Sequence, residues 1–313
     1  MKVYYNKKAF KGYRGGMTET VLCMPFEDSN NWPEEPLHNN RFEPIFKLPQ
    51  EHLQYTSLQE CDFAILPYKY EDTAQTQQLV KEANESSKKI LVFYNDDDEG
   101  PLNLSPEQGY VFRTSLNAHD REINELAFPA FVGDFYHESF LITDLEKQKT
   151  IGFCGQALTP LRRKVIQKLR KQNTLKTDFI LRHGFWAPEI PKEQARKDFL
   201  DNMKNNLFNV CIRGAGNFSY RLYETLMMGR IPLIINSNQV FPFDKLLNYN
   251  DFSIVIQEDE ITNIDSIINE WFLKNQNNLS QIQIHNRNIW EKYMSPEGWV
   301  KQFRNEINSI NKC

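Results

Sequence analysis

The sequence lacks the features that would mark a membrane or secreted protein. It contains no run of about 18 apolar residues, which is roughly the length that a membrane-spanning helix needs. The first residues, MKVYYNKKAFKGYRGG, hold no apolar stretch of the kind found in signal peptides. The five cysteines are scattered and form no CxxC pair, so neither a structural zinc site nor a redox dithiol is indicated. We therefore expect a reduced, cytoplasmic protein without an integral membrane segment.

Positive charge is not in excess either. The 313 residues carry a formal net charge of -4, whereas a protein that coats nucleic acid usually carries a basic excess. We therefore expect no nucleic-acid partner. What the chain does contain is 40% hydrophobic residues, which is enough for the cores of two domains of roughly 150 residues each.

Short apolar runs alternate with longer polar stretches, which is typical of an α/β protein. In the first half of the chain, strands are expected over 20–26, 61–68, 88–95 and 109–115. In the second half, strands are expected over 150–155, 179–184, 207–214, 231–236 and 251–257. Helices are expected between most of these strands and, after the last one, over 262–275, 279–294 and 297–310.

The most informative segment is 207–247. A buried strand over its first residues leads into a turn with two glycines, Gly214 and Gly216, and then into a helix that begins near Ser219. Glycine lets a backbone come close to a ligand, and the free N–H groups at a helix start favour an anion. On its own, Gly-x-Gly is nevertheless more often an ordinary strand-to-helix turn than a binding site.

Charged side chains around this turn strengthen the case for a site. Arg213 and Arg221 lie on either side of it, and arginine side chains match the oxygens of a phosphate. Glu224 follows Arg221 by three residues on the same helix face, where a carboxylate can reach ribose hydroxyls. The residue types therefore predict a site for a nucleoside diphosphate. The alternative is a plain intrahelical ion pair between Arg221 and Glu224.

The run RGAGNFSYRLYETLMMGRIPLIINSNQVFPF strongly resembles the signature of the exostosin-type glycosyltransferases. In that family an Arg-Gly turn after a strand precedes a Ser-x-Arg-x-x-Glu helix, a strand with a small residue two positions before a proline, and a later Pro-Phe. CDFAILPY, KKILVFYNDDD, VFRTSL, FPAFVGDF and IGFCG are also similar to segments of the family's bacterial members. The resemblance covers roughly residues 60–250.

This resemblance implies a GT-B fold, in which two Rossmann-like α/β domains face each other across a cleft. We expect an acceptor-side domain over 1–145 and a domain that binds the nucleotide sugar over 146–296. The final segment, 297–313, is expected to cross back as a helix and pack on the first domain, because Trp299 and Phe303 belong to an apolar stripe at helical spacing.

The resemblance also implies an inverting transfer from a nucleoside-diphosphate sugar, with UDP as the expected nucleotide. The acceptor would be a saccharide or a lipid-linked saccharide. The sequence shows no N-terminal anchor or stem like that of the animal enzymes, which favours bacterial surface polysaccharide or lipopolysaccharide synthesis. We expect the protein to work in the cytoplasm, with peripheral association at the inner face of the cell membrane left open.

Donor-binding residues carry over from the family by position. Arg213, Arg221 and Glu224 match its signature, and Arg162 or Arg163 matches a basic residue that faces the diphosphate. With the glycines and the adjoining turn, the expected donor-binding set is Gly155, Arg162, Arg163, Arg213, Gly214, Gly216, Asn217, Ser219, Tyr220, Arg221 and Glu224. The acidic run 96–99 is the only dense carboxylate cluster and lies in the other half of the chain, so we expect no metal cofactor.

Spacing does not identify the general base that the transfer needs. Asp134, His137 and Glu138 end the first domain and are expected to face the cleft, and His183 after a strand is the reserve candidate. Each of them is individually more often an ordinary polar residue. The alternative function is a non-catalytic nucleotide-sugar-binding or scaffold subunit, which the intact arginine and glutamate signature disfavours.

Overall fold

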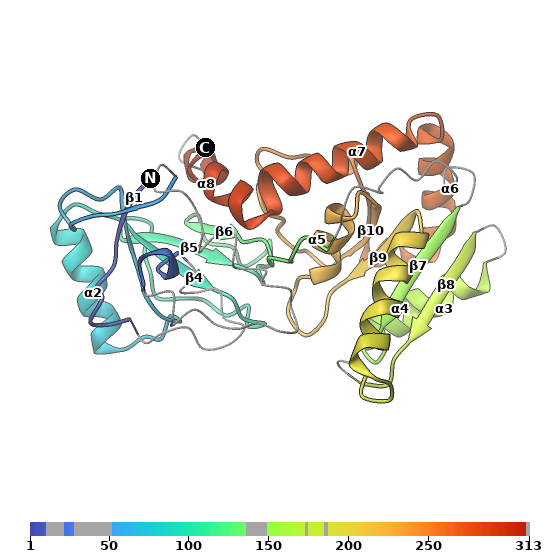
Figure 1. Ribbon diagram of the computed structural model, residues 1–313, viewed down its shortest axis with the longest axis horizontal. Coiled ribbons are helices and arrows are strands. Elements are labelled where there is room, and N and C mark those ends of the chain that lie inside the picture. The colour runs from blue at the N-terminus through green and yellow to red at the C-terminus, as the bar shows by residue number, and fades with distance from the viewer. Residues whose placement is uncertain (11–21, 28–51, 136–148, 173–174, 185–186, 311–313) are drawn as a thin grey trace.

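The computed structural model describes residues 1–10, 22–27, 52–135, 149–172, 175–184 and 187–310. These residues form two parallel sheets that lie side by side (Figure 1). The first sheet has the order β2-β1-β3-β4-β5-β6, built from Lys2–Tyr4 (β1), Gln54–Tyr55 (β2), Phe63–Ile65 (β3), Ile90–Tyr94 (β4), Gly109–Arg113 (β5) and Glu125–Ala127 (β6). The second has the order β11-β10-β9-β7-β8, built from Thr150–Gly155 (β7), Lys176–Leu181 (β8), Phe208–Ile212 (β9), Ile231–Asn236 (β10) and Ile254–Gln257 (β11).

Most of the expected strands are confirmed, because each was a buried apolar run. The strand expected over 20–26 is wrong in its described part, where Met24–Phe26 is a 3-10 helix, η1. Pro25 explains the difference, since its φ suits a helical turn and it lacks the N–H that a strand ladder needs. The strand expected over 179–184 lies earlier, at β8. The short strands β1, β2 and β6 were not expected, because two or three residues show no clear alternation.

Helices cover both faces of the second sheet. The α-helices of the described residues are Ala74–Glu85 (α2), Pro160–Lys171 (α3), Lys192–Asn205 (α4), Tyr220–Met227 (α5), Ile264–Asn275 (α6), Leu279–Ile289 (α7) and Pro296–Ile310 (α8). Helices α3 and α6 share one core with that sheet, whereas α5 and α7 pack together in the other core. Within the described residues, no helix has both the length and the apolar character needed to cross a bilayer.

The last helices run from the second sheet back to the first. Helix α7 continues through a π-helical turn, Trp290–Met294 (η6), into α8, which ends beside the N-terminal strands (Figure 1). Trp299 on α8 is fully buried, and its ring centroid lies 5.4 Å from that of Phe112 and 4.8 Å from that of Phe128. Two Rossmann-like domains with a returning C-terminal helix constitute the GT-B fold, so the expected fold class is confirmed. The domain boundary expected at residue 145 lies outside the described residues.

Candidate functional site

The strand order of the second sheet marks where a ligand would bind. Strand β7 lies between β8 and β9, so the chain leaves β7 towards one side of the sheet and later returns on its other side. In parallel α/β sheets, ligands bind outside the carboxyl ends of the strands at this reversal. Here those ends are Gly155 on β7 and Ile212 on β9. The turn that the sequence singled out follows β9 directly and therefore lies at this point.

Helix α5 begins at the same edge of the sheet. Ser219 is its N-cap residue, but the hydroxyl makes no capping hydrogen bond. Tyr220 opens the helix with 37% of its surface exposed, and its ring packs on Phe218 at 5.5 Å between centroids. Before it, the amide of Gly214 donates to the carbonyl of Phe218 at 3.4 Å. The side chain of the N-cap residue therefore does not compete with an anion for the N–H groups at the helix start.

Arg221 reaches from α5 to the end of β7. Its Nη2 donates to the carbonyl oxygen of Cys154, and its guanidinium carbon lies 5.0 Å from the ring centroids of both Phe153 and Phe199. A Cβ atom at Gly155 would lie 3.6 Å from Nη2, in van der Waals contact with it. In the part of the chain that the structure describes, Nε of Arg221 is buried without a hydrogen-bond partner. Arg221 is thus held in place and retains an unused donor.

Arg162, from α3, fastens the two strand ends to each other. Its Nε and Nη2 donate to the carbonyls of Arg213 and Ile212 at 2.9 and 3.2 Å, and its Nη1 donates to that of Gln156 at 3.1 Å. Burial, together with the positive charge of Arg221, lowers the pKa of Arg162 to about 10. Arg163, by contrast, is exposed on the outer face of α3. Of the two adjacent arginines, only Arg162 lies in the site.

The first domain closes the site from the opposite side. Arg213 donates to Glu99 at 2.7 Å, and a side chain at Gly216 would begin 2.5 Å from Oδ1 of Asp97. The amide of Asn217, which is fully buried, donates to Ser115 Oγ at 2.7 Å. The carboxyl ends of the two sheets therefore face each other across this loop.

The acidic run 96–99 lies beside the donor turn, contrary to the prediction from the sequence. The sequence placed it away from the donor phosphates because it belongs to the other half of the chain. It follows β4, however, and the carboxyl end of β4 points at the turn after β9, so Asp97 and Glu99 contact that turn. Asp96 pairs instead with Lys69. No group of three or more His, Cys, Asp or Glu side chains among the described residues is arranged to hold a metal ion.

Sequence reasoning missed two residues of α4 at the same edge. The guanidinium carbon of Arg196 lies 3.9 Å from the ring centroid of Phe135. The ring centroid of Phe199 lies 5.4 Å from the guanidinium carbon of Arg196 and 5.0 Å from that of Arg221. Burial lowers the pKa of Arg196, and the nearby charge of Glu224 opposes that shift. Glu224 is therefore close enough to Arg196 for the two charges to interact. No sequence motif identifies Arg196, because its position at the site depends on how α4 packs beside β7.

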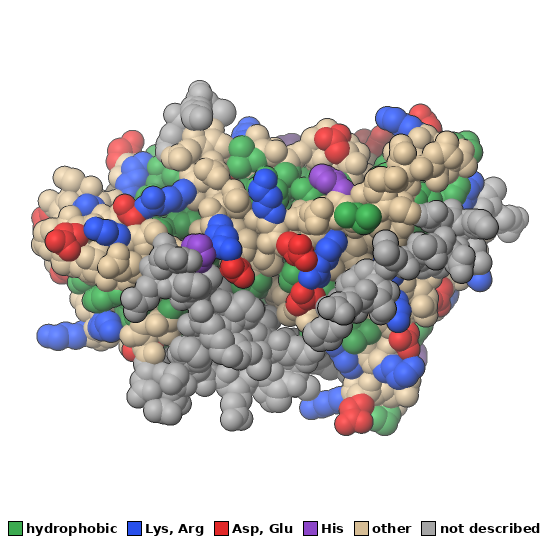
Figure 2. Space-filling view, turned by 45° about the horizontal axis from the view of Figure 1, so that its top comes forward, with side chains coloured by type: hydrophobic (Ala, Val, Ile, Leu, Met, Phe, Trp, Pro, Cys, Tyr) green, Lys and Arg blue, Asp and Glu red, His purple; other side chains and the backbone are tan. Residues whose placement is uncertain are grey.

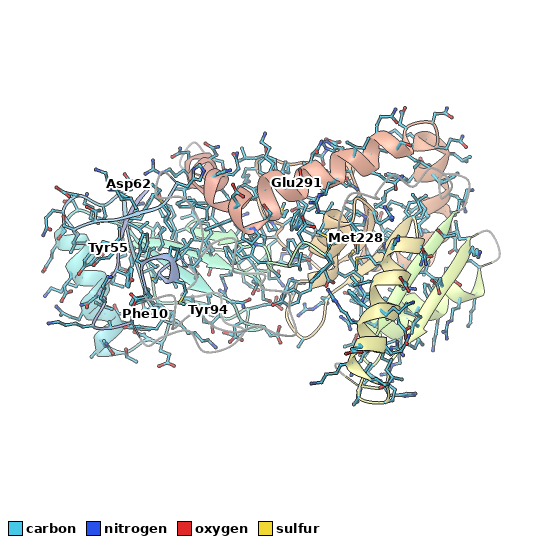
Figure 3. All side chains as sticks on the ribbon, in the orientation of Figure 1. Phe10, Tyr55, Asp62, Tyr94, Met228 and Glu291 are labelled. Carbon is cyan, nitrogen blue, oxygen red and sulfur yellow. The ribbon has the colours of Figure 1, made fainter. Side chains whose placement is uncertain are left out.

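Two of the four base candidates, Asp134 and His183, lie within the described residues. Asp134 is held by Arg287, whose Nη1 and Nη2 approach its oxygens at 3.0 and 2.6 Å. Arg287 also donates to Met227, at the opposite end of α5 from Arg221; Figure 3 labels the adjoining Met228. His183 is exposed just beyond β8. His137 and Glu138 lie outside the described residues. The role of each as a base remains a prediction.

A known protein family and several known proteins match the part of the chain that contains this candidate site. The model of the exostosin GT47 domain matches residues 115–271, which is half of the chain. A probable glycosyltransferase of Arabidopsis thaliana is 36% identical over 70 residues, covering 22% of this chain and 14% of that protein. The exostosin-1 homolog of Caenorhabditis elegans is 24% identical over 102 residues, covering 33% and 26%. This chain thus matches about a quarter or less of each relative's length.

Among solved structures, Anabaena Alr3699/HepE in complex with UDP and glucose is similar over 98% of this chain and 99% of that chain. Its TM-score is 0.43 and its sequence identity 11%.

Proposed function

The chain belongs to the exostosin GT47 family, and we propose that it is an active glycosyltransferase whose donor site lies at the carboxyl ends of β7 and β9. One observation carries the proposal. The Arg-Gly turn and the Ser-x-Arg-x-x-Glu helix lie at the strand-order reversal of the second sheet, the position at which parallel α/β sheets bind ligands.

The donor would be a nucleoside-diphosphate sugar, with UDP as the proposed nucleotide because the family resemblance implies it. Its diphosphate would lie against the first turn of α5, within reach of Arg221, whose Nε is buried and unused. Arg213 would contribute when a phosphate oxygen replaces the carboxylate of Glu99. Glu224 would accept hydrogen bonds from the ribose. Arg162 contributes by holding the two strand ends at a fixed separation.

The reaction we propose is a single displacement with inversion. An acceptor hydroxyl attacks the anomeric carbon, its proton passes to a base, and the bond to the diphosphate breaks with its electrons on the departing oxygen. The leaving diphosphate needs positive charge, which Arg221 and the start of α5 would supply without a metal ion. Asp97 joins the base candidates, because it is an exposed carboxylate of the first domain that touches Gly216 in the donor loop.

The acceptor we propose is a saccharide or a lipid-linked saccharide in bacterial surface polysaccharide or lipopolysaccharide synthesis. The test is release of nucleotide from a panel of nucleotide sugars, with and without saccharide acceptors, in EDTA and in Mg²⁺ or Mn²⁺. Acceptor-dependent release of UDP that persists in EDTA supports the proposal. Loss of most turnover in EDTA would overturn its metal-free part. Binding of UDP without any release would favour a non-catalytic, nucleotide-sugar-binding subunit.

A further inference from the structure

Helix α3 is strongly basic, whereas the chain as a whole is acidic. Its sequence, PLRRKVIQKLRK, contains six Lys and Arg residues and no Asp or Glu, although the whole chain has a formal net charge of -4. Over the face drawn in Figure 2, basic and acidic side chains are interspersed. The helix is therefore a local concentration of charge and does not follow from the overall composition.

The apolar and basic residues of α3 lie on opposite sides. Val165, Ile166 and Leu169 are buried in the core shared with α6. The other side forms an open hollow of about 480 Å³ lined by Pro160, Arg163, Lys164, Gln167, Lys168 and Lys171. In the part of the chain that the structure describes, the one ion pair of these cations joins Lys168 to Asp265 at 3.5 Å. Most of the positive charge on this outer face is thus not neutralised by the protein.

An exposed apolar residue lies close in sequence to the start of this helix. Leu158 precedes the helix by two residues and keeps 58% of its surface exposed. Cations on a helix, together with an exposed apolar residue just before it, match the interface of a bilayer with anionic headgroups. A nucleic acid would satisfy the cations but would offer Leu158 no apolar phase, so the membrane is the partner that accounts for both features.

We propose that the outer face of α3, with Leu158, docks on a membrane that carries anionic phospholipids. The hollow would receive headgroup phosphates, and Leu158 would enter the headgroup boundary. The same helix starts at Pro160 and places Arg162 in the candidate site, so docking would hold that site beside the membrane. This inference does not depend on the proposed transferase activity, although it suits an acceptor that is linked to a lipid.

The experiment measures binding of the full chain to vesicles of phosphatidylcholine with about 30% phosphatidylglycerol, and to vesicles of phosphatidylcholine alone. Each Lys or Arg near an anionic surface contributes about fivefold in affinity. The triple variant Arg163→Gln, Lys164→Gln, Lys171→Gln should therefore bind the anionic vesicles roughly 100-fold more weakly. The matched control is Lys81→Gln, Lys192→Gln, Lys197→Gln, which removes the same charge from exposed positions on α2 and α4 and should stay within about twofold.

Three results would overturn the inference: failure of the wild type to bind anionic vesicles at low salt, an equal loss in both triple variants, or tighter binding to duplex DNA than to vesicles. All of the altered side chains are exposed, so unchanged melting temperatures verify that the variants fold. Calorimetric titration of UDP on the same samples separates this inference from the proposed function. Vesicle binding without UDP binding would support the docking surface and would contradict the proposed donor site.

Discussion

Arg162 and Arg163 show how two adjacent residues of one type acquire different roles. Both follow the Gly155 turn, and the sequence could not choose between them as the basic residue of the site. The rotation of α3 about its own axis determines which arginine enters the site. Arg162 points at the strand ends and donates to three backbone carbonyls, while Arg163 is exposed on the outer face. That rotation is fixed by the burial of Val165 and Leu169, which a single motif does not reveal.

Replacing Arg162 by Met should destabilise the protein. The substitution keeps an apolar stem but leaves three carbonyls without their donor, and unsatisfied buried polar groups cost about 1–3 kcal/mol each. Because water can reach part of the site, we expect a loss of about 2–4 kcal/mol in the free energy of unfolding, measured in urea. Arg163→Met is the control and should change stability by less than about 0.5 kcal/mol. Equal effects of the two substitutions would contradict the assigned role of Arg162.

The base can be sought among the carboxylates and imidazoles that remain candidates. Asp97→Asn should lower turnover about 100-fold or more while UDP affinity stays unchanged, because a base acts only on the acceptor proton. Asp134→Asn tests the competing candidate, which Arg287 engages at the far end of α5. A large loss in Asp134→Asn with normal rates in Asp97→Asn would restore the original assignment. His137→Ala, Glu138→Gln and His183→Ala complete the series.

At the scale of elements, α8 joins the two halves of the molecule through a buried carboxyl group. Glu306 accepts a hydrogen bond from the amide of Phe243 at 2.7 Å, in the loop after β10. Burial raises the pKa of Glu306 to about 8, the nearby charge of Asp244 adds to the shift, and that of Arg121 opposes it. The folded protein therefore binds this proton more tightly than the unfolded chain does.

This shift has a definite consequence for stability. A carboxyl group whose pKa is raised by folding contributes stability that is complete below its unfolded pKa near 4.5 and is lost as pH rises towards 8. The loss is on the order of 3–5 kcal/mol. Glu306→Gln cannot ionise, so its unfolding free energy should fall less than that of the wild type between pH 5 and about 8. Glu297→Gln, exposed on the same helix, should keep the wild-type slope; a parallel slope in Glu306→Gln would contradict the account.

The elements themselves were largely predictable, and their exceptions have physical causes. Buried strands such as β9 and β10 appear as continuous apolar runs because helices cover both faces of a parallel sheet. The 3-10 helix η1 was mistaken for a strand because a buried turn can be as apolar as a strand. The missed strands β1 and β2 are short, and only their pairing with each other and with β3 identifies them.

At the scale of the whole molecule, the sequence identified one half of the site and not the other. The turn after β9 and helix α5 form a local motif of adjacent residues, so it could be recognised in one dimension. The residues opposite it, Asp97 and Glu99, lie more than one hundred positions earlier and meet Arg213 and Gly216 only when the two sheets face each other. Figure 3 labels Tyr94, which ends β4 just before this acidic run.

The central claim is that the start of α5 binds a nucleoside diphosphate, and calorimetric titration of UDP tests it most directly. Arg221→Ala should weaken UDP about 30-fold or more, because it removes a charged partner from a closed site. Glu224→Gln should weaken UDP by about 10- to 100-fold through loss of a charged acceptor. Arg163→Ala, on the outer face of α3, should bind UDP as the wild type does. If wild type, Arg221→Ala and Glu224→Gln bind UDP equally, or none of them binds it, the donor site is not at this helix.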